Sequence, residues 1–457
     1  MLKINRDNER FLNEIKRIHM IGIGGSGMCP LAEILHAKGY IISGSDNNVG
    51  DPLRRVQSLG IKTFMGHKPE NIDGAELVVY SAAIGADNPE RVEAQRRGIP
   101  TMERSELFGA ITRKFDRVIG VCGTHGKTTV TSLLTQILYL NDFDPTAVIG
   151  GMLPIIGANG RAGKSEYMVC EACEYVDTFL HLSPDITVLL NIDNDHMEYF
   201  KTMENLTESF HKFIAMGSLA YINGDDERCL SAAKDINART VTFGFGSHND
   251  YYPMNMTPGK KGMEFDVFCR GEKLTHIAMQ IPGEHNVLNG LAAFSVAHDL
   301  GICSNSIAKA IEKFTGAGRR FEFLCTKNGI TFADDYAHHP TEIMATLKAA
   351  KSLKYNRVIA VFQPFTFSRT AMLKDDFIEA LKIADKVILT PIMGSREKNT
   401  FNIHSEDLQC KIPNSAVVQD FDEAEKAIFE TAQSGDLVLT MGGGDIYKVS
   451  HKIRDTE

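Results

Sequence analysis

Apolar and polar positions along the chain form a repeating pattern of short apolar runs, each followed by a longer stretch with helical spacing. Each run ends at glycine or polar residues, and the stretch behind it has apolar residues three and four positions apart. Buried parallel strands that alternate with amphipathic helices have these features, so the pattern predicts an α/β protein. The expected strands cover residues 17–21, 40–43, 77–81, 118–121, 167–170, 186–190, 330–333, 357–362, 387–389 and 437–440.

The chain has 457 residues, which is more than one ordinary core accommodates, and about three domains are usual at this length. Residues 107–116 have the character of a passage between domains, and Gly316-Ala317-Gly318 is typical of a hinge. Between residues 241 and 280, short alternating runs predict a small antiparallel sheet. We therefore expect domains over residues 1–115, 116–316 and 317–457.

The composition, with 43% hydrophobic and 23% charged residues, is that of a soluble globular protein. The net charge of −9 argues against a nucleic-acid partner, and no apolar run approaches the ~18 residues of a membrane span. Residues 1–17 contain no apolar core of the signal-peptide type, and the nine cysteines are scattered. We expect a cytoplasmic protein with reduced thiols and no membrane partner, as a monomer or a homodimer.

The strongest local signal is Gly123-Thr124-His125-Gly126-Lys127-Thr128-Thr129, between an expected strand and a helix over residues 128–140. Backbone N–H groups of such a turn and the start of the helix face one point, where phosphate binds, and the lysine adds a charge. The hydroxyl that follows the lysine is a Mg²⁺ ligand in loops of this type. Because Val121 stands where the full motif has its first glycine, this is a shortened phosphate-binding loop.

Polar residues also follow two later strands of the middle domain. Glu171 and Glu174 come after one strand, and the segment from Asn191 to His196 comes after the next. Because ligands bind at the carboxyl ends of parallel strands, these side chains are expected to meet the Lys127 loop. Carboxylates suit Mg²⁺, so the sequence predicts a magnesium–nucleotide site. Each acid taken alone is more often a helix cap or a surface group, and it is the clusters after several strands that favour the site.

A second glycine-rich turn, Gly22-Ile23-Gly24-Gly25-Ser26-Gly27, follows the first expected strand, and Asp46 stands about twenty positions further on. This is G-x-G-x-x-G in the context of a βαβ unit. It indicates a site for a nucleotide diphosphate. NAD is disfavoured because we find no other part of a dehydrogenase in the chain.

These motifs and several others resemble those of the Mur ligases of peptidoglycan synthesis. The resemblance runs nearly from end to end, with the motifs in the same order. It includes residues 19–28, 123–129, 191–196, 283–286, 318–321, 334–340 and 362–369. The first of these motifs points to the branch of the family that adds alanine, or to its relative that recycles peptides.

The resemblance implies an N-terminal Rossmann-like domain that binds the UDP substrate and a central P-loop-type ATPase-like domain that contains the small antiparallel sheet. It further implies a C-terminal Rossmann-like domain that closes over ATP and binds the amino acid. The implied activity is an ATP- and Mg²⁺-dependent ligation of the lactyl carboxylate of UDP-N-acetylmuramate to L-alanine through an acyl phosphate. Such an enzyme takes part in cell wall biogenesis, and through it in cell shape and cell division.

By the same resemblance, the catalytic residues are Lys127, His196, Glu171 and Arg369, and the metal ligands are Thr128, Glu171 and His196. ATP is expected at Gly123, Thr124, His125, Gly126, Lys127, Thr128, Thr129, Asn286 for adenine, Arg320 for phosphate and Asp335 for ribose. The UDP substrate and the amino acid are expected at Gly24, Gly25, Ser26, Gly27, Asp46, His125, Tyr336, His338 and Arg369.

The sequence departs from the family pattern at three positions. Cys173 stands where many relatives have aspartate, and Phe365 and Thr366 stand where histidine and arginine are frequent. Two other functions are compatible with the sequence. One is the same chemistry with a tripeptide in place of alanine, and the other is a nucleotide-gated binding protein without ligase activity.

Overall fold

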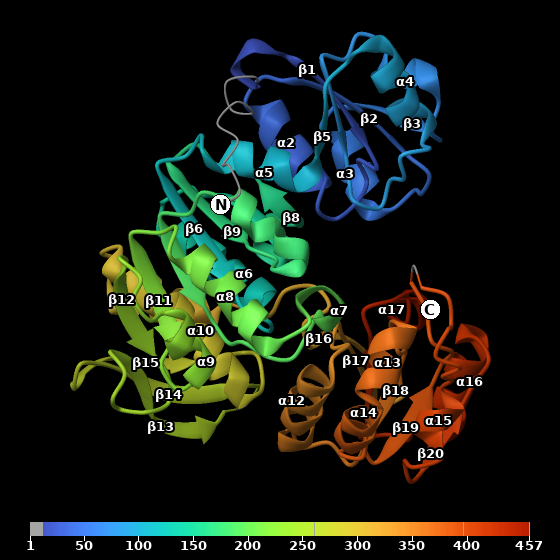
Figure 1. Cartoon of the computed structure of the whole chain (residues 1–457). Helices are drawn as coiled ribbons and strands as arrows, with labels where there is room; N and C mark the ends of the chain where they lie inside the picture. Colours follow the sequence, from blue (N-terminus) through green and yellow to red (C-terminus); the bar gives the residue numbers. More distant parts are fainter. Residues whose placement is uncertain (1–11, 260, 396, 457) are drawn as a thin grey trace. The chain divides into compact units, whose positions relative to one another are not determined.

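Figure 1 shows the computed structural model of the chain, which describes residues 12–259, 261–395 and 397–456. The chain forms two compact units. The first runs to Pro253 and includes Val267–Thr275 and Asn289–Ile311, and the second includes Met254–Asp266, His276–Leu288 and the chain from Glu312 onward. The domain limits expected from the sequence stay predictions. Residues 1–11, part of the N-terminal segment in which we found no signal-peptide pattern, lie outside the described residues.

The first sheet has five parallel strands in the order β3-β2-β1-β4-β5 (Figure 1). Its strands are β1 (Arg17–Ile21), β2 (Ile41–Asp46), β3 (Lys62–Met65), β4 (Leu77–Tyr80) and β5 (Thr101–Glu103). Its helices are α2 (Cys29–Ala37), α3 (Asp51–Ser58), η1 (Pro69–Ile72), α4 (Pro89–Arg97) and α5 (Arg104–Thr112). The strand order reverses between β1 and β4, the position at which open sheets of this kind bind ligands. The glycine-rich turn after β1 lies at this position.

Residues 107–116, expected as a passage between domains, largely belong to helix α5. The side chain of Glu103 accepts a hydrogen bond at the start of this helix, and Glu106 reaches back to the N–H of Glu103, which forms a capping box. The helix then buries Leu107, Phe108 and Ile111. Apolar spacing in this segment therefore belongs to a packed helix.

The second sheet has ten strands in the order β15-β14-β13-β12-β11-β10-β6-β9-β7-β8. Its strands are β6 (Arg117–Cys122), β7 (Thr146–Leu153), β8 (Ala158–Arg161), β9 (Tyr167–Glu171), β10 (Ile186–Leu189), β11 (Leu219–Asn223), β12 (Arg239–Phe243), β13 (Tyr251–Pro258), β14 (Met263–Cys269) and β15 (Glu272–Ala278). Its helices are α6 (Lys127–Leu140), η2 (Pro154–Ile156), η3 (Tyr175–His181), α7 (Met197–Phe200), α8 (Met203–Ile214), α9 (Glu227–Ala232), α10 (Glu284–Asp299) and α11 (Ser304–Glu312). Strand β6 lies between β9 and β10 and is parallel to both, so the carboxyl ends of these three strands are neighbours.

Two expectations for this part of the chain need correction. Strand β12 pairs in parallel with β11, and β13 in turn pairs in parallel with β12, so the parallel part of the sheet continues beyond residue 241, where we expected antiparallel strands to begin. The sequence predicts a helix over residues 287–300, but helix α10 begins at Glu284, so Asn286 lies in its first turn. Gly283, with a φ of 99°, makes the turn before the helix, and the acidic Glu284 favours the helix N-terminus.

The third sheet has the strand order β16-β17-β21-β18-β19-β20. Its strands are β16 (Glu322–Lys327), β17 (Ile330–Asp335), β18 (Val358–Phe362), β19 (Lys386–Leu389), β20 (Ser415–Val417) and β21 (Leu437–Met441). Its helices are α12 (Pro340–Ser352), α13 (Phe367–Met372), α14 (Lys374–Leu381), α15 (Glu406–Gln409), α16 (Phe421–Thr431) and α17 (Tyr447–Asp455). Only β16 runs antiparallel to its neighbour, and apolar clusters cover both faces of the sheet. Across the described part of the chain, no helix has the length and apolar character needed to cross a membrane.

Candidate active site

The phosphate-binding loop joins β6 to α6, and Asn191 at the end of β10 holds it in place. The Asn191 side chain accepts a hydrogen bond from the N–H of His125 at 2.8 Å and donates one to the carbonyl oxygen of His125 at 3.0 Å. Gly123 and Gly126 have φ values of 131° and 89°, which a side chain would disfavour. The loop is therefore shaped by its glycines and fixed by the neighbouring strand.

Lys127 opens α6, and its ammonium group turns back into the loop. The Nζ atom donates to the carbonyl oxygens of Gly123 at 2.6 Å and Thr124 at 3.0 Å. It also forms an ion pair with Glu174 at 2.9 Å, and the two side chains are only 13% and 2% exposed. Burial lowers the pKa of Lys127, but the opposing effect of the nearby acids, chiefly Glu174, is larger, so the pKa is raised. Lys127 is therefore a cation at neutral pH.

Glu171, the last residue of β9, lies directly beside the loop. Its Oε2 atom accepts hydrogen bonds from the Thr128 hydroxyl at 2.9 Å and from the N–H of Gly150 at 2.8 Å. Among the described residues it has no ion pair with lysine or arginine, so its charge is not already neutralised. A hydroxyl and a carboxylate side by side at a phosphate-binding loop are oxygen donors of the kind that Mg²⁺ prefers. The residues present therefore fit a magnesium site.

Gly150 in β7 is a residue that the sequence reasoning missed. A Cβ atom at this position would lie 2.5 Å from Oε2 of Glu171 and 2.8 Å from Oγ1 of Thr128, closer than side-chain atoms approach. We predict that Gly150→Ala displaces the Glu171 carboxylate and raises the Mg²⁺ concentration for half-maximal turnover by about tenfold. The control is Met152→Ala, in the same strand with a side chain 48% exposed. Equal Mg²⁺ requirements for both variants would contradict the prediction.

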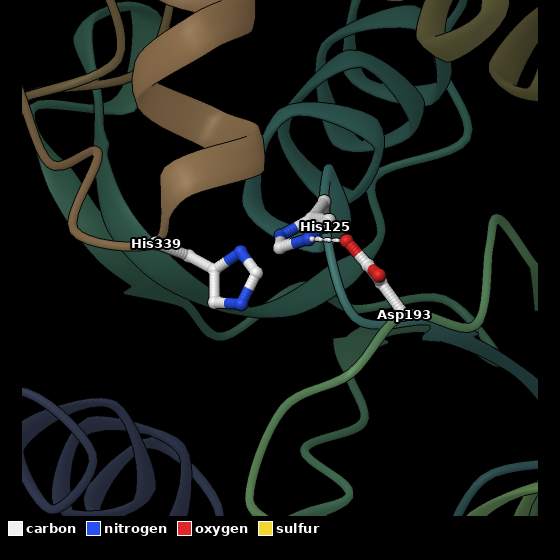
Figure 2. Close-up of side chains that lie close together, drawn as sticks. All are labelled: His125, Asp193 and His339. Atoms are coloured by element: carbon white, nitrogen blue, oxygen red, sulfur yellow. Dashed lines mark hydrogen bonds and ion pairs between the residues drawn. The ribbon is translucent and has the colours of Figure 1, made fainter. Parts of the chain in front are cut away.

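His125 and Asp193 form the pair shown in Figure 2. The imidazole Nε2 of His125 and the carboxylate Oδ2 of Asp193 are 3.1 Å apart, and the N–H of Asp193 donates to the Thr124 hydroxyl at 2.9 Å. The segment after β10 thus holds the side chain of His125 as well as its backbone. His125 is oriented at the phosphate-binding loop and is not a histidine packed in the core.

His196 precedes helix α7 with a φ of 57°, a left-handed conformation that is uncommon for a residue with a side chain. Its imidazole packs on the ring of Tyr175, with 4.8 Å between the centroids, and Tyr175 follows Glu174 directly. Its two ring nitrogens lie near Asp195 at 3.7 Å and Glu198 at 3.5 Å. His196 is therefore linked to Lys127 through Tyr175 and its neighbour Glu174.

The second unit brings four of the predicted residues together. Asp335 ends β17 and accepts hydrogen bonds from the N–H groups of Phe321 and Ala337, both at 2.7 Å. The guanidinium of Arg320 lies 5.1 Å from the centroid of the Tyr336 ring, whose centroid in turn is 5.1 Å from that of His338. The carboxylate, the guanidinium, the phenol and the imidazole thus gather at the carboxyl end of β17.

We predict that Asp335 makes the stability of the second unit depend on pH. Burial raises the pKa of this carboxyl to about 6, although Arg320 counteracts it. The folded state therefore keeps a proton that the unfolded chain has released, so the free energy of unfolding falls by about 2 kcal/mol as pH rises from 4 to 6. Asp335→Asn should flatten this fall in urea unfolding measured at pH 4, 5, 6 and 7. If the free energy of unfolding of the wild type and of Asp335→Asn changed with pH in the same way, the prediction would be wrong.

The remaining predicted residues lie in three places. The side chain of Asn286 donates to the carbonyl oxygen of Pro282 at 2.7 Å. Arg369 lies on α13, where Thr366, one of the departures from the family pattern, caps the helix by accepting from the N–H of Arg369. Asp46 accepts a hydrogen bond from the N–H of Gly24 at 2.9 Å, so part of its carboxylate shapes the first glycine-rich turn.

The chain is similar in sequence to several proteins named as ligases. It is 43% identical over 446 residues to the UDP-N-acetylmuramate–L-alanine ligase of Acetivibrio thermocellus, covering 96% of this chain and 95% of the relative. It is also 43% identical over 449 residues to the protein of that name from Caldicellulosiruptor saccharolyticus, covering 96% and 99%. The chain belongs to the Mur ligase family. Three family descriptions match it: "Mur ligase family, catalytic domain" over residues 17–116, "Mur ligase middle domain" over 121–297 and "Mur ligase, glutamate ligase domain" over 319–444.

Solved structures agree with this family. The UDP-N-acetylmuramate-alanine ligase of Thermotoga maritima matches with a TM-score of 0.83 and 27% identity, covering 96% of this chain and 98% of that one. The murein peptide ligase of Psychrobacter arcticus shares the fold, with a TM-score of 0.74 and 23% identity over 96% and 98% of the two chains. The predicted three-domain α/β fold of a Mur ligase is confirmed. Because Mur ligases depend on ATP, the prediction of ATP as a substrate is confirmed too.

Proposed function

We propose that this protein forms the amide bond between the lactyl carboxylate of UDP-N-acetylmuramate and the amine of L-alanine, with cleavage of ATP to ADP and phosphate. The observation that carries the proposal is the meeting of Lys127, Thr128 and Glu171 at neighbouring strand ends. It occurs in a chain 43% identical over 446 residues to a protein named for this reaction. We infer a cytoplasmic location, since the reaction consumes ATP.

The reaction brings two anions together, so it depends on neutralisation and in-line positioning. The lactyl carboxylate attacks the γ-phosphorus, which gives an acyl phosphate and ADP, and the alanine amine then attacks the acyl carbon and phosphate leaves. Lys127 is held at the loop by Gly123 and Thr124, and its third donor faces Glu174. In the proposed complex this donor turns to the β- and γ-phosphates.

Thr128, Glu171 and His196 would hold Mg²⁺, which when bound offsets phosphate charge during transfer. Glu171 is kept in place by Thr128 and Gly150. Asp195 and Glu198 lie beside the two nitrogens of His196 and orient its ring. These neighbours give the ligand set a fixed arrangement before the nucleotide arrives.

Other residues are assigned to the substrates as part of the same proposal. Asn286 would contact adenine, Arg320 phosphate and Asp335 the ribose of ATP. The UDP substrate and the amino acid would contact Gly24, Gly25, Ser26, Gly27, Asp46, His125, Tyr336, His338 and Arg369. Asp335 at the end of β17 and Asn286 in the first turn of α10 are buried and hydrogen-bonded, which supports their roles.

The test is an ADP-release assay with UDP-N-acetylmuramate in which amino acids are supplied one at a time. We expect ADP release that requires both the UDP sugar and an amine, with L-alanine the best donor. Preference for a tripeptide would make the protein a recycling ligase. Phosphate release that is the same with and without both substrates would identify a nucleotide-gated binding protein instead.

A further inference from the structure

The segment that follows β9 contains two consecutive residues in a strained backbone conformation. Val176 and Asp177 have φ values of 53° and 57°, in the left-handed region that favours glycine. This region is especially unfavourable for a β-branched residue such as valine. Such conformations persist only where the surrounding structure enforces them, and they are concentrated at functional sites. The contacts that hold this segment therefore indicate its role.

The segment is fixed at both of its ends. At its start, Glu174 is buried and forms the ion pair with Lys127 at 2.9 Å. At its end, Phe179 is buried and stacks on Phe213, with 4.7 Å between the ring centroids and 4° between the ring planes. The N–H of Phe179 also donates to the carbonyl oxygen of Cys173 at 3.0 Å, which closes the turn. The residues between these points are therefore held in the left-handed turn by the phosphate-binding loop on one side and the core on the other.

The strained segment contacts the segment that carries His196 at two places. The Tyr175 ring packs on the His196 imidazole, and the Tyr199 hydroxyl donates to Oδ2 of Asp177 at 2.7 Å. The other carboxylate oxygen of Asp177 accepts a hydrogen bond from the hydroxyl of Ser209 in α8. With both of its oxygens bonded, the Asp177 carboxylate ties the strained segment to α7 and to α8.

Helix α7 depends on such contacts for its orientation. It has only four residues, Met197–Phe200, and a helix of this length is not stable by itself. It lies between two further left-handed residues, His196 with a φ of 57° and Lys201 with a φ of 68°. The hydrogen bond from Tyr199 to Asp177 connects this short helix to the segment after β9. The direction of the His196 side chain is thus coupled to that segment.

We propose that Tyr175, Asp177 and Tyr199 are positioning residues that set the ring plane of His196 for the metal ion. The proposal rests on the proposed function, in which His196 is a metal ligand. Tyr175 packs against the imidazole with 4.8 Å between the centroids, and the hydrogen bond between Asp177 and Tyr199 fixes the helix behind it. Removal of the groups that orient a ligating histidine commonly weakens metal binding about 10- to 100-fold. The strained turn serves to hold the two segments in this arrangement.

The first measurement is the NMR shift of the His196 ring protons in histidine-labelled protein without ligands, assigned with His196→Gln. An aromatic ring 4.8 Å away displaces these signals through its ring current. We expect Tyr175→Leu to lose this displacement and Tyr175→Phe, which keeps the ring, to retain it. The matched control is Tyr139→Leu, which removes a tyrosine that is 39% exposed near the C-terminal end of α6.

The second measurement is the affinity for Mn²⁺, determined by electron paramagnetic resonance on protein saturated with a non-hydrolysable ATP analogue. We expect Tyr175→Leu, Asp177→Ala and Tyr199→Phe each to bind Mn²⁺ about tenfold more weakly. Because Asp177 and Tyr199 share one hydrogen bond, the double variant should bind no more weakly than the weaker single variant. Asp177→Asn keeps an oxygen that accepts from the Tyr199 hydroxyl, so it should retain near wild-type affinity.

The outcomes separate this proposal from the proposed function. If either the His196 shift or the Mn²⁺ affinity were the same in the wild type and Tyr175→Leu, the role of Tyr175 would be overturned. Additive losses of Mn²⁺ affinity in the Asp177 and Tyr199 variants would overturn the role of their hydrogen bond. The proposed function fails on a different result, an absence of ADP release that depends on both UDP-N-acetylmuramate and an amine. Thermal unfolding of the same samples shows that each variant is folded.

Discussion

Lys127→Ala is expected to lower kcat by at least about 10²- to 10³-fold in the ADP-release assay, the largest effect of any single substitution in this chain. In the proposed reaction Lys127 supplies a full positive charge where two anions approach, and no other lysine or arginine in the described residues forms an ion pair with Glu174. Lys127→Arg should fail as well, because a planar guanidinium does not replace a compact ammonium between two carbonyl oxygens. A near-normal rate in either variant would remove Lys127 from the mechanism.

Lys127→Ala is also expected to lower the stability of the fold, because it breaks the buried ion pair with Glu174. Without Lys127, the carboxylate of Glu174 stays buried with no counter-ion, and breaking a buried pair in this way typically costs about 3–5 kcal/mol. The double variant Lys127→Ala/Glu174→Gln removes the uncompensated charge. We expect it to recover most of the lost thermal stability while turnover stays abolished. Recovery of turnover would show that the single variant failed through misfolding.

Glu171→Gln is expected to have the second largest effect, on the metal requirement. Glutamine retains an oxygen that can accept from Thr128 and Gly150 but loses the negative charge, so the fold is preserved while Mg²⁺ is held less well. The Mg²⁺ concentration for half-maximal turnover should rise by about tenfold or more. Nucleotide binding measured with and without Mg²⁺ gives a second readout, since the metal should strengthen it less in the variant.

The matched control for this prediction is Glu166→Gln, an exposed glutamate just before β9, at the opposite end of the same strand from Glu171. It changes the net charge of the protein by the same amount and should leave the Mg²⁺ requirement unchanged. An unchanged requirement in Glu171→Gln would exclude Glu171 as a metal ligand. A raised requirement in both variants would point to a general charge effect.

Much of the fold could be predicted from the sequence because buried parallel strands are short apolar runs with a clear end. The runs that became β1, β6, β9 and β10 were recognisable for this reason, and their polar ends at Lys127, Glu171 and His196 could be assigned to one edge of a sheet. Helix boundaries were less certain. α5 and the start of α10 depend on capping side chains and a turn glycine, which apolar spacing does not reveal.

The role of Gly150, which supports the site from a neighbouring strand, could not be predicted from the sequence. Gly150 stands in β7, with β9 as its neighbour in the sheet, and the absence of a Cβ matters there only because Glu171 arrives beside it.

The sequence by itself determined the local chemistry of this protein: two glycine-rich turns, a lysine at a helix start, and acids at strand ends, together with the strand–helix alternation that places them at sheet edges. These features follow from neighbours in the chain, whose geometry is set by backbone stereochemistry and short-range hydrogen bonds. The tertiary structure alone decided which individual groups make contact within the site. The partners of Lys127 and Glu171 lie 47 and 21 positions away in the chain, at Glu174 and Gly150. Such pairings depend on how strands are ordered in a sheet, because that order brings distant carboxyl ends within hydrogen-bond reach.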